Sequence, residues 1–295
     1  MSAYHTPVLL HESIAALAIR EDGVYVDATF GGGGHSREIL RNLGPKGRLI
    51  AFDKDGEALA NAPDDERLTV VHHDFRFVHN FVKYHGYETV DGILADLGVS
   101  SHQFDTGERG FSFRFENAPL DMRMNQDAPV SAADIVNSYS GEDLERIFRL
   151  YGEVEGSRRV AELIVSSRER SPLKTTDDLG RALAPVLPKF LEHKYLAKIY
   201  QALRIEVNGE MTSLEGFMKG AMRTLGQGAR LAVITYHSLE DRIVKTAIRE
   251  GSQTGLLSRV NKKPILPSEE EIASNTRARS AKLRVAERQI DEHER

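Results

Sequence analysis

The sequence predicts an α/β fold in which a doubly wound, mostly parallel sheet carries an inserted all-helical domain. Short apolar runs alternate with helix-patterned segments, which is typical of parallel strands covered on both faces. A run of four glycines, Gly31–Gly34, follows the first apolar run. No comparable strand pattern occurs between about Phe104 and Ile205. Together these observations indicate one sheet domain interrupted by a helical insertion.

The sheet domain is expected at both ends of the chain. Its expected strands are Val24–Phe30, Arg48–Asp53, Leu68–His72, Val90–Leu97 and Arg230–Tyr236. Helical patterns occur at Gly56–Ala62 and Asp241–Arg249, and short late strands are expected at Lys262–Leu266 and Ala281–Glu287. The first part of the sheet domain is therefore predicted to span residues 1–104, and the second part, with a basic C-terminal segment, residues 207–295.

The insertion, residues 105–206, is predicted to be helical and to recognise the substrate. Its helical patterns are Glu142–Leu150, Arg158–Ser167, Thr176–Leu183 and Ala197–Ile205. Ser131 is an expected N-cap, and Thr175 or Thr176 another, because their hydroxyls can accept hydrogen bonds from the first amides of a helix.

The composition of the 295-residue chain is that of a globular protein and excludes several kinds of chemistry. Hydrophobic residues make up 40%, and neither a membrane-spanning run nor a secretion signal is recognisable, so a cytoplasmic protein is expected. The chain has no cysteine, which excludes disulfides, thiolate metal sites and cysteine nucleophiles. His72–His73 lacks the further ligands of a zinc site, and no metal is expected.

The glycine run and Asp53 together predict a nucleoside-containing cofactor. Glycines between a strand and a helix let a ligand approach the backbone amides, because they lack a Cβ and tolerate positive φ. Asp53 ends the second strand about 20 residues beyond the glycines, where such folds place a carboxylate on ribose hydroxyls. The alternative is that the glycines serve turn geometry only. Asp53 makes this alternative less favourable, because its distance in sequence from the glycines and its position at a strand end both match those of a ribose-binding carboxylate.

The loop favours S-adenosylmethionine over a nicotinamide dinucleotide. A dinucleotide fold expects a third glycine where this chain has Ser36, and an acidic residue, Asp27, precedes the loop. The predicted architecture is therefore a Rossmann-like S-adenosylmethionine methyltransferase sheet. Without cysteine, such an enzyme cannot activate carbon 5 of a pyrimidine through a cysteine adduct. Direct methyl displacement onto nitrogen or oxygen remains.

Three further residues are expected near the same edge of the sheet. Asp96 ends the fourth strand, where an unpaired acid costs stability, and it is the candidate catalytic residue. Its alternative role is to cap the next turn through the amides of Gly98 or Val99. Phe75 follows the third strand and could stack on an adenine, although a lone Phe is more often part of a core. Gln103 could reach the same pocket with a donor and an acceptor.

Two later segments each allow a structural and a functional interpretation. Ser238, followed by Glu240 and Asp241, is a good helix start, so His237 is either a satisfied hydrogen-bonding residue or a base. The net charge is −5, yet basic residues cluster near the C-terminus: Arg259, Lys262, Lys263, Arg277, Arg279, Lys282, Arg284 and Arg288. Such a cluster is either a solvated surface or a face for RNA phosphates.

Eight ordered motifs resemble those of one family. They are His5–Glu12, Gly32–Ser36, Asp96–Ser101, Arg109–Phe113, Pro119–Met124, Gln201–Asn208, His237–Arg242 and Arg279–Arg284. In this order, and nearly end to end, they resemble the bacterial small-subunit ribosomal RNA methyltransferase H family (MraW type). The resemblance implies an S-adenosylmethionine-dependent enzyme that methylates N4 of a cytidine in the decoding region of 16S rRNA.

The resemblance also implies site residues and partners. Its cofactor contacts fall on Gly33, Gly34, His35, Asp53, Phe75, Asp96 and Gln103, all of the matching type. The expected partner is 16S rRNA within the small ribosomal subunit, without a membrane or a metal; the oligomeric state stays open, with a homodimer as one option. The chain departs from the family at Lys194–Tyr200, where a His-Pro-Ala-Thr-Arg-type segment is usual. Lys198 keeps a positive charge there but lacks the bidentate geometry of arginine.

Three other functions stay open on the sequence. A small-molecule methyltransferase would share the cofactor half of the site. An NAD-dependent oxidoreductase is disfavoured by Ser36. A non-catalytic RNA-binding protein would leave the set of pocket residues unexplained.

Overall fold

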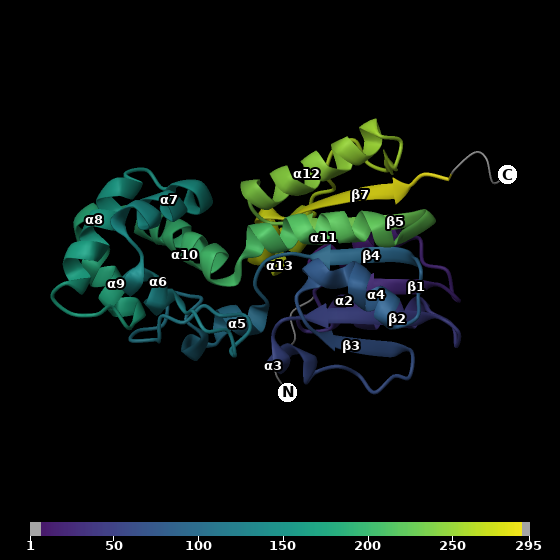
Figure 1. Cartoon of the computed structure of the whole chain (residues 1–295), viewed down its shortest axis with the longest axis horizontal. Coiled ribbons are helices and arrows are strands. Elements are labelled where there is room, and N and C mark those ends of the chain that lie inside the picture. The colour runs from purple at the N-terminus through teal and green to yellow at the C-terminus, as the bar shows by residue number, and fades with distance from the viewer. Residues whose placement is uncertain (1–6, 291–295) are drawn as a thin grey trace. The chain divides into compact units, whose positions relative to one another are not determined.

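The chain divides into two compact units, which are described here from a computed structural model covering residues 7–290 (Figure 1). The sheet unit comprises Met1–Gly98 and Met211–Arg295, and the helical unit comprises Val99–Glu210. The division falls a few residues from the predicted boundaries after residues 104 and 206. His5, in the first of the family motifs, lies outside the described residues. No helix within residues 7–290 is long and apolar enough to cross a membrane.

The sheet unit contains seven strands within its described residues, in the order β3-β2-β1-β4-β5-β7-β6. The strands are β1 Val24–Asp27, β2 Arg48–Asp53, β3 Leu68–His72, β4 Val90–Asp96, β5 Leu225–Thr235, β6 Leu257–Arg259 and β7 Lys282–Arg288. The first five are parallel, and β7 runs antiparallel between β5 and β6. The chain order switches direction between β1 and β4, which is where open α/β sheets bind ligands.

The predicted doubly wound, mostly parallel sheet is confirmed. The strands β2 and β3 have the predicted bounds, and β4 ends one residue before the predicted Leu97. The strand β1 ends at Asp27 rather than Phe30, because the backbone amide of Phe30 bonds Phe52 of β2 as the chain turns into the glycine loop. The strand β5 begins earlier than predicted, at Leu225.

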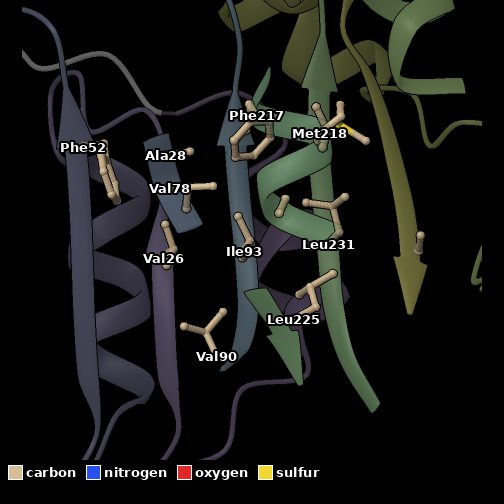
Figure 2. Close-up of a cluster of buried hydrophobic side chains, with 14 of the residues drawn as sticks. Val26, Ala28, Phe52, Val78, Val90, Ile93, Phe217, Met218, Leu225 and Leu231 are labelled. Carbon is tan, nitrogen blue, oxygen red and sulfur yellow. The ribbon is translucent and has the colours of Figure 1, made fainter. Parts of the chain in front are cut away.

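One face of the sheet is covered by α4 (Val78–Tyr84), α11 (Glu210–Thr224) and α12 (Ser238–Gln253). The helix α11 presents an apolar stripe at helical spacing, formed by Leu214, Phe217, Met218 and Ala221, all buried. Figure 2 shows Phe217 and Met218 of this stripe beside strand residues such as Ile93. This cluster holds the strands in place beneath the site.

The opposite face is covered by α1 (Leu10–Leu17) and α2 (Gly34–Asn42). Ile39 and Leu40 of α2 are buried with Leu49 of β2 and Leu94 of β4. Because side chains alternate along a strand, Leu49 and Leu94 face α1 and α2 while Ile50 and Ile93 face α11. Continuous apolar strands are thus explained by burial on both faces.

The predicted strand at Lys262–Leu266 is wrong. The structure has β6 at Leu257–Arg259 instead, and only Ile265 of the predicted segment pairs with β7, through an isolated bridge to Leu283. Pro264 has no backbone N–H to donate, so a regular ladder through this segment cannot form. The late strand expected at Ala281–Glu287 is confirmed as β7 at Lys282–Arg288.

The helical unit contains α5 Ser101–Asp105, α6 Ala132–Ser138, α7 Gly141–Gly152, α8 Ser157–Arg168, α9 Thr176–Leu183 and α10 Glu192–Asn208. Its own core includes the fully buried Phe148, Ile164 and Leu203. Ser131 and Thr175 cap α6 and α9 as predicted. Across residues 99–210, all of which the structure describes, no ladder of strands forms and the one bridge joins Pro119 and Thr175.

Candidate functional site

Three aspartates end neighbouring strands at the carboxyl edge of the sheet. Asp27 is the last residue of β1, Asp53 of β2 and Asp96 of β4. The registers pair β1 with both β2 and β4, so the three side chains belong to adjacent strands. The sequence predicted the edge and two of these acids as cofactor contacts, Asp53 and Asp96; Asp27 was noted only as an acid before the loop.

The glycine loop turns directly from β1 into α2. Gly33 has a φ of 74° and immediately precedes the helix, a conformation that glycine adopts without strain. A Cβ on Gly34 would lie 2.1 Å from Cγ of Pro7, so the loop packs closely against the N-terminal segment. Both glycines are therefore required by the fold itself, in addition to any ligand they contact.

The carboxylate of Asp53 fixes the glycine loop at the carboxyl edge of the sheet. Its carboxylate accepts hydrogen bonds from the amides of Gly31 at 2.8 Å and Asp55 at 2.9 Å. Burial raises the pKa of Asp53, and these amide hydrogen bonds partly oppose that rise. The position of this carboxylate is thus fixed by backbone amides of the protein itself.

Asp27 is completely buried beneath the loop. It accepts a hydrogen bond of 2.6 Å from the hydroxyl of Ser36 and one of 3.1 Å from the amide of Thr29. Burial raises the pKa of Asp27 to about 7, against the lowering effect of these hydrogen bonds, and Asp53 adds a further rise. Ser36, which stands where a dinucleotide fold would have glycine, therefore has a definite role as the partner of this acid.

Asp96 is held from two sides. The hydroxyl of Tyr236, at the end of β5, donates a 2.6 Å hydrogen bond to Oδ1, and Nδ1 of His35 lies 3.7 Å from Oδ2. The backbone amide of Asp96 donates to the hydroxyl of Thr29 at 2.7 Å. Burial raises the pKa of Asp96 to about 7, the Tyr236 hydrogen bond opposes the rise, and Asp27 adds to it. The role of Tyr236 was not anticipated.

His35 is a buried, neutral imidazole rather than a counter-ion for Asp96. Burial lowers the pKa of His35 to about 4, and its Nε2 lies 3.1 Å from the carbonyl oxygen of Val8. A carbonyl only accepts, so Nε2 carries the proton and Nδ1 faces Asp96 with its lone pair. The ring thereby ties the N-terminal segment to the first turn of α2.

Phe75 follows β3 in a short 3-10 turn whose cap is Asp74. The Phe75 ring packs edge-on against Phe217 at 5.0 Å between centroids. Asp74 forms a 2.8 Å ion pair with Nζ of Lys54 and accepts a 2.7 Å hydrogen bond from the hydroxyl of Ser213. This network fixes the segment that carries Phe75. The sequence predicted Phe75 but not the polar network beside it.

Gln103 lies in the helical unit and is buried there. It forms a capping box at the start of α5, in which its side chain accepts from the amide of Ser100 and the hydroxyl of Ser100 accepts from the amide of Gln103. The other six predicted cofactor residues belong to the sheet unit. The capping box gives Gln103 a structural role within its own unit.

His237 caps α12, one residue before the helix start that the sequence indicated. Glu240 returns its carboxylate to the amides of Tyr236 at 2.7 Å and His237 at 3.3 Å, which completes a capping box. The amide of Glu240 faces Nδ1 of His237 at 3.5 Å. The structural interpretation of His237 therefore fits better than that of a general base.

The three strand-end acids lack a cationic partner in the part of the chain that the structure describes. Among residues 7–290, no lysine or arginine forms an ion pair with Asp27, Asp53 or Asp96, while the adjacent Lys54 is taken by Asp74. Buried carboxylates without counter-ions are costly unless a ligand supplies positive charge. The edge is therefore suited to a cationic ligand and is unfavourable for a pyrophosphate.

The sequence profile of the MraW methylase family matches residues 2–289. The chain belongs to this family. Ribosomal RNA small subunit methyltransferase H of Flavobacterium johnsoniae is 52% identical over 97% of this chain and 98% of its own length. Proteins of the same name from Parabacteroides distasonis and Bacteroides fragilis are 50% and 51% identical, each over 97% of this chain and 98% of their own length.

The basic segment of this MraW-family chain divides into internal and exposed residues. Arg284 forms two bonds to Asp241 of α12, at 2.7 and 3.0 Å, and its side chain is only 14% exposed. Arg288 donates to the carbonyl of Met222. Arg259, Lys262, Lys263 and Arg279 are exposed. Only part of the predicted basic cluster is therefore available to a partner.

The family departure at Lys194–Tyr200 forms the first half of α10. Lys198 donates from Nζ to the backbone carbonyl of Glu153 at 3.0 Å, so its ammonium closes the end of α7. The hydroxyl of Tyr200 is buried and has no hydrogen-bond partner among the described residues. In this structure Lys198 has a structural role.

Proposed function

We propose that this protein transfers a methyl group from S-adenosylmethionine to N4 of a cytidine in the decoding region of 16S rRNA. The observation that carries the proposal is the set of three strand-end acids beside the glycine loop, of which Asp27 is fully buried and Asp53 and Asp96 are partly buried, and none of which has a lysine or arginine partner among the described residues. Membership of the MraW methylase family and the names of the relatives support the reaction and the RNA substrate.

The charges and residue types at the strand ends of the sheet unit suit the donor. Asp53 would hold the ribose hydroxyls, Phe75 would stack on the adenine, and the backbone of Gly33 and Gly34 would face the amino-acid end. When bound, S-adenosylmethionine supplies an activated methyl group on a positively charged sulfur. The negative charge of Asp27, beneath the loop, would attract the sulfonium and ammonium groups of the donor. It would repel the pyrophosphate of a nicotinamide dinucleotide.

Asp96 is the proposed acceptor for the exocyclic amine of the cytidine. The amine is a weak nucleophile, because its lone pair is conjugated with the ring. A carboxylate that accepts one N–H favours the pyramidal geometry of attack and stabilises the positive charge that develops on nitrogen. Tyr236 occupies Oδ1 of Asp96 and so orients the carboxylate. His35 is neutral and therefore does not form an ion pair with the Asp96 carboxylate.

The helical unit and the exposed part of the basic segment are the proposed RNA-binding elements. The target base must leave its stack to enter the site, which is least costly in single-stranded or distorted RNA. The small ribosomal subunit is the proposed physiological substrate, as the relatives' names suggest. A small-molecule acceptor would need neither the helical unit nor exposed cations.

The proposal is tested by transfer of labelled methyl from S-adenosylmethionine to unmethylated small ribosomal subunits, followed by nucleoside digestion and mass analysis. We expect N4-methylcytidine from the wild-type protein and at least a hundredfold lower rate from Asp96→Asn, because removing a transition-state hydrogen bond of this kind costs about 3 kcal/mol. Asp53→Asn should weaken donor binding about ten- to hundredfold.

The control is Asp64→Asn, which removes the same charge from a position outside the site. It should leave donor binding and methyl transfer unchanged. Donor binding without any label in RNA would reject the rRNA substrate and keep the cofactor assignment. Full activity of Asp96→Asn would reject the role given to Asp96.

A further inference from the structure

The edge of β7 that faces away from β5 pairs with β6 over part of its length. Beyond β6, a side chain takes the place of a strand. Along this edge β6 pairs from Leu257↔Arg288 to Arg259↔Ala286, and the amide of Val260 donates to Val285 at 3.1 Å. The ladder resumes only at Ile265, which exchanges two 2.9 Å backbone bonds with Leu283. Between these two stretches, the amide of Val285 is the backbone group of β7 that is left without a backbone partner among the described residues.

Asn261 bonds this amide and also shares the carbonyl of Leu283 with Ile265. Its Oδ1 accepts from the amide of Val285 at 2.8 Å, and its Nδ2 donates to the carbonyl of Leu283 at 3.2 Å and to that of Lys263 at 2.8 Å. One amide side chain thus replaces the missing strand residues and closes the loop formed by residues 261–264. These three hydrogen bonds hold the base of the loop against β7.

The residues that this loop presents are cations. Lys262 and Lys263 are exposed at its tip, and Arg259 is exposed at the end of β6 just before it. Among residues 7–290, none of the three forms an ion pair with a carboxylate. Glu287, which faces Ser258 across the ladder, is paired with Arg230 at 2.9 Å. The positive charge of the loop is therefore not neutralised from the sheet beside it.

We infer that Arg259, Lys262 and Lys263 form a phosphate-binding ridge for the rRNA backbone, positioned by the Asn261 side chain. The inference rests on the proposed function for its RNA partner. Three exposed cations within five residues concentrate positive charge on one loop, and contacts of this kind with the RNA backbone set affinity and register without reading sequence. Arg284 and Arg288 of the same segment instead bond groups of the sheet unit itself.

The test is the salt dependence of binding to unmodified 16S rRNA transcript. Each phosphate bound by a cation contributes about 0.7 to 0.9 to the magnitude of the slope of log K against log salt concentration. The triple variant Arg259→Gln/Lys262→Gln/Lys263→Gln should therefore lower the slope by about 2 and weaken binding at least tenfold near physiological salt. Its binding of S-adenosylmethionine should be that of the wild-type protein.

The matched control removes three exposed cations elsewhere in the sheet unit: Lys46→Gln/Lys219→Gln/Arg249→Gln. Equal slopes for the two triple variants would overturn the ridge, because general charge removal would then explain any effect. The wild-type methylation assay separates this outcome from the proposed function. Methylation with equal slopes rejects only the ridge, whereas distinct slopes without any methylation reject only the proposed reaction.

Asn261→Ala gives an independent check, since it keeps all three cations and removes their support. We expect several-fold weaker RNA binding with a salt slope near that of the wild-type protein, because the charges remain but are no longer pre-positioned. RNA affinity equal to that of the wild-type protein would overturn the positioning role of Asn261.

Discussion

At the scale of single residues, the hydrogen bond from Tyr236 to Asp96 controls when the carboxylate can act. The ionised form of Asp96 is the stronger acceptor for an amine that gains positive charge, and burial raises the pKa of Asp96 to about 7. Methyl transfer should therefore increase as the pH rises through about 7. The Tyr236 hydroxyl lowers this pKa, so its removal moves the rise to higher pH.

Tyr236→Phe is predicted to shift the acid limb of the kcat/KM profile for the donor, which reports the free protein, upward by about one pH unit, since a hydrogen bond to a charged group is worth about 1.5 kcal/mol or more. Activity at pH 7 should fall about fivefold and recover to nearly the wild-type value above about pH 9. The profile is measured with saturating RNA and with the donor well below saturation, so that it reports the pKa of Asp96 in the protein without donor. Tyr84→Phe, at a position that is 81% exposed, is the control. An equal loss of activity at all pH values would contradict this role.

The sequence could identify most of the site residues but few of their partners. Asp53 and Asp96 were predictable, because strand ends in parallel sheets meet at one edge. The bond between Tyr236 and Asp96 joins residues 140 positions apart and has no local sequence signal. Gln103 matches one of the family's cofactor contacts in residue type. Its hydrogen bonds with Ser100 in the helical unit are those of a capping box.

At the scale of elements, local chemistry explains which predictions were accurate. Ser131 and Thr175 were predictable caps because the motif lies within four residues of sequence. The predicted strand at Lys262–Leu266 failed because the pairing depends on a side chain, Asn261, that substitutes for backbone. Apolar β-prone runs predict a strand whether or not a partner edge is available.

The ion pair between Arg284 and Asp241 joins β7 to the first turn of α12. The two side chains are only 14% and 15% exposed, and removal of one partner leaves an uncompensated charge. Arg284→Gln is predicted to lower the free energy of unfolding by about 3 kcal/mol, measured by urea denaturation of the protein without ligands. The exposed Arg279→Gln should change it by less than about 0.5 kcal/mol. If the two variants are equally stable, the pair contributes nothing to the fold.

At the scale of the whole molecule, donor binding should be coupled to proton release. Asp27 and Asp96 each have a pKa raised to about 7 by burial, and a bound cation would lower both values. The acids are then partly protonated in the free protein and ionised in the complex. The affinity for S-adenosylmethionine should therefore rise with pH through about 7 and level off above it.

Titration calorimetry at about pH 6.5, in two buffers of different ionisation enthalpy, measures this coupling. We predict release of about one proton per S-adenosylmethionine bound, and a smaller release with S-adenosylhomocysteine, which lacks the sulfonium charge. Asp27→Asn should roughly halve the release, provided that it binds the donor. Binding without proton release in the wild-type protein would mean that the acids do not sense the charge of the donor.

The placement of the helical unit between two neighbouring strands has a consequence during protein synthesis. β4 ends at residue 96, and its partner β5 ends at residue 235. At about 5–20 residues per second, a ribosome needs on the order of ten seconds to make the intervening chain. Throughout that interval the apolar β4, with Ile93 and Leu94, lacks the neighbour that later covers its edge, and the nascent sheet has to avoid pairing with other chains.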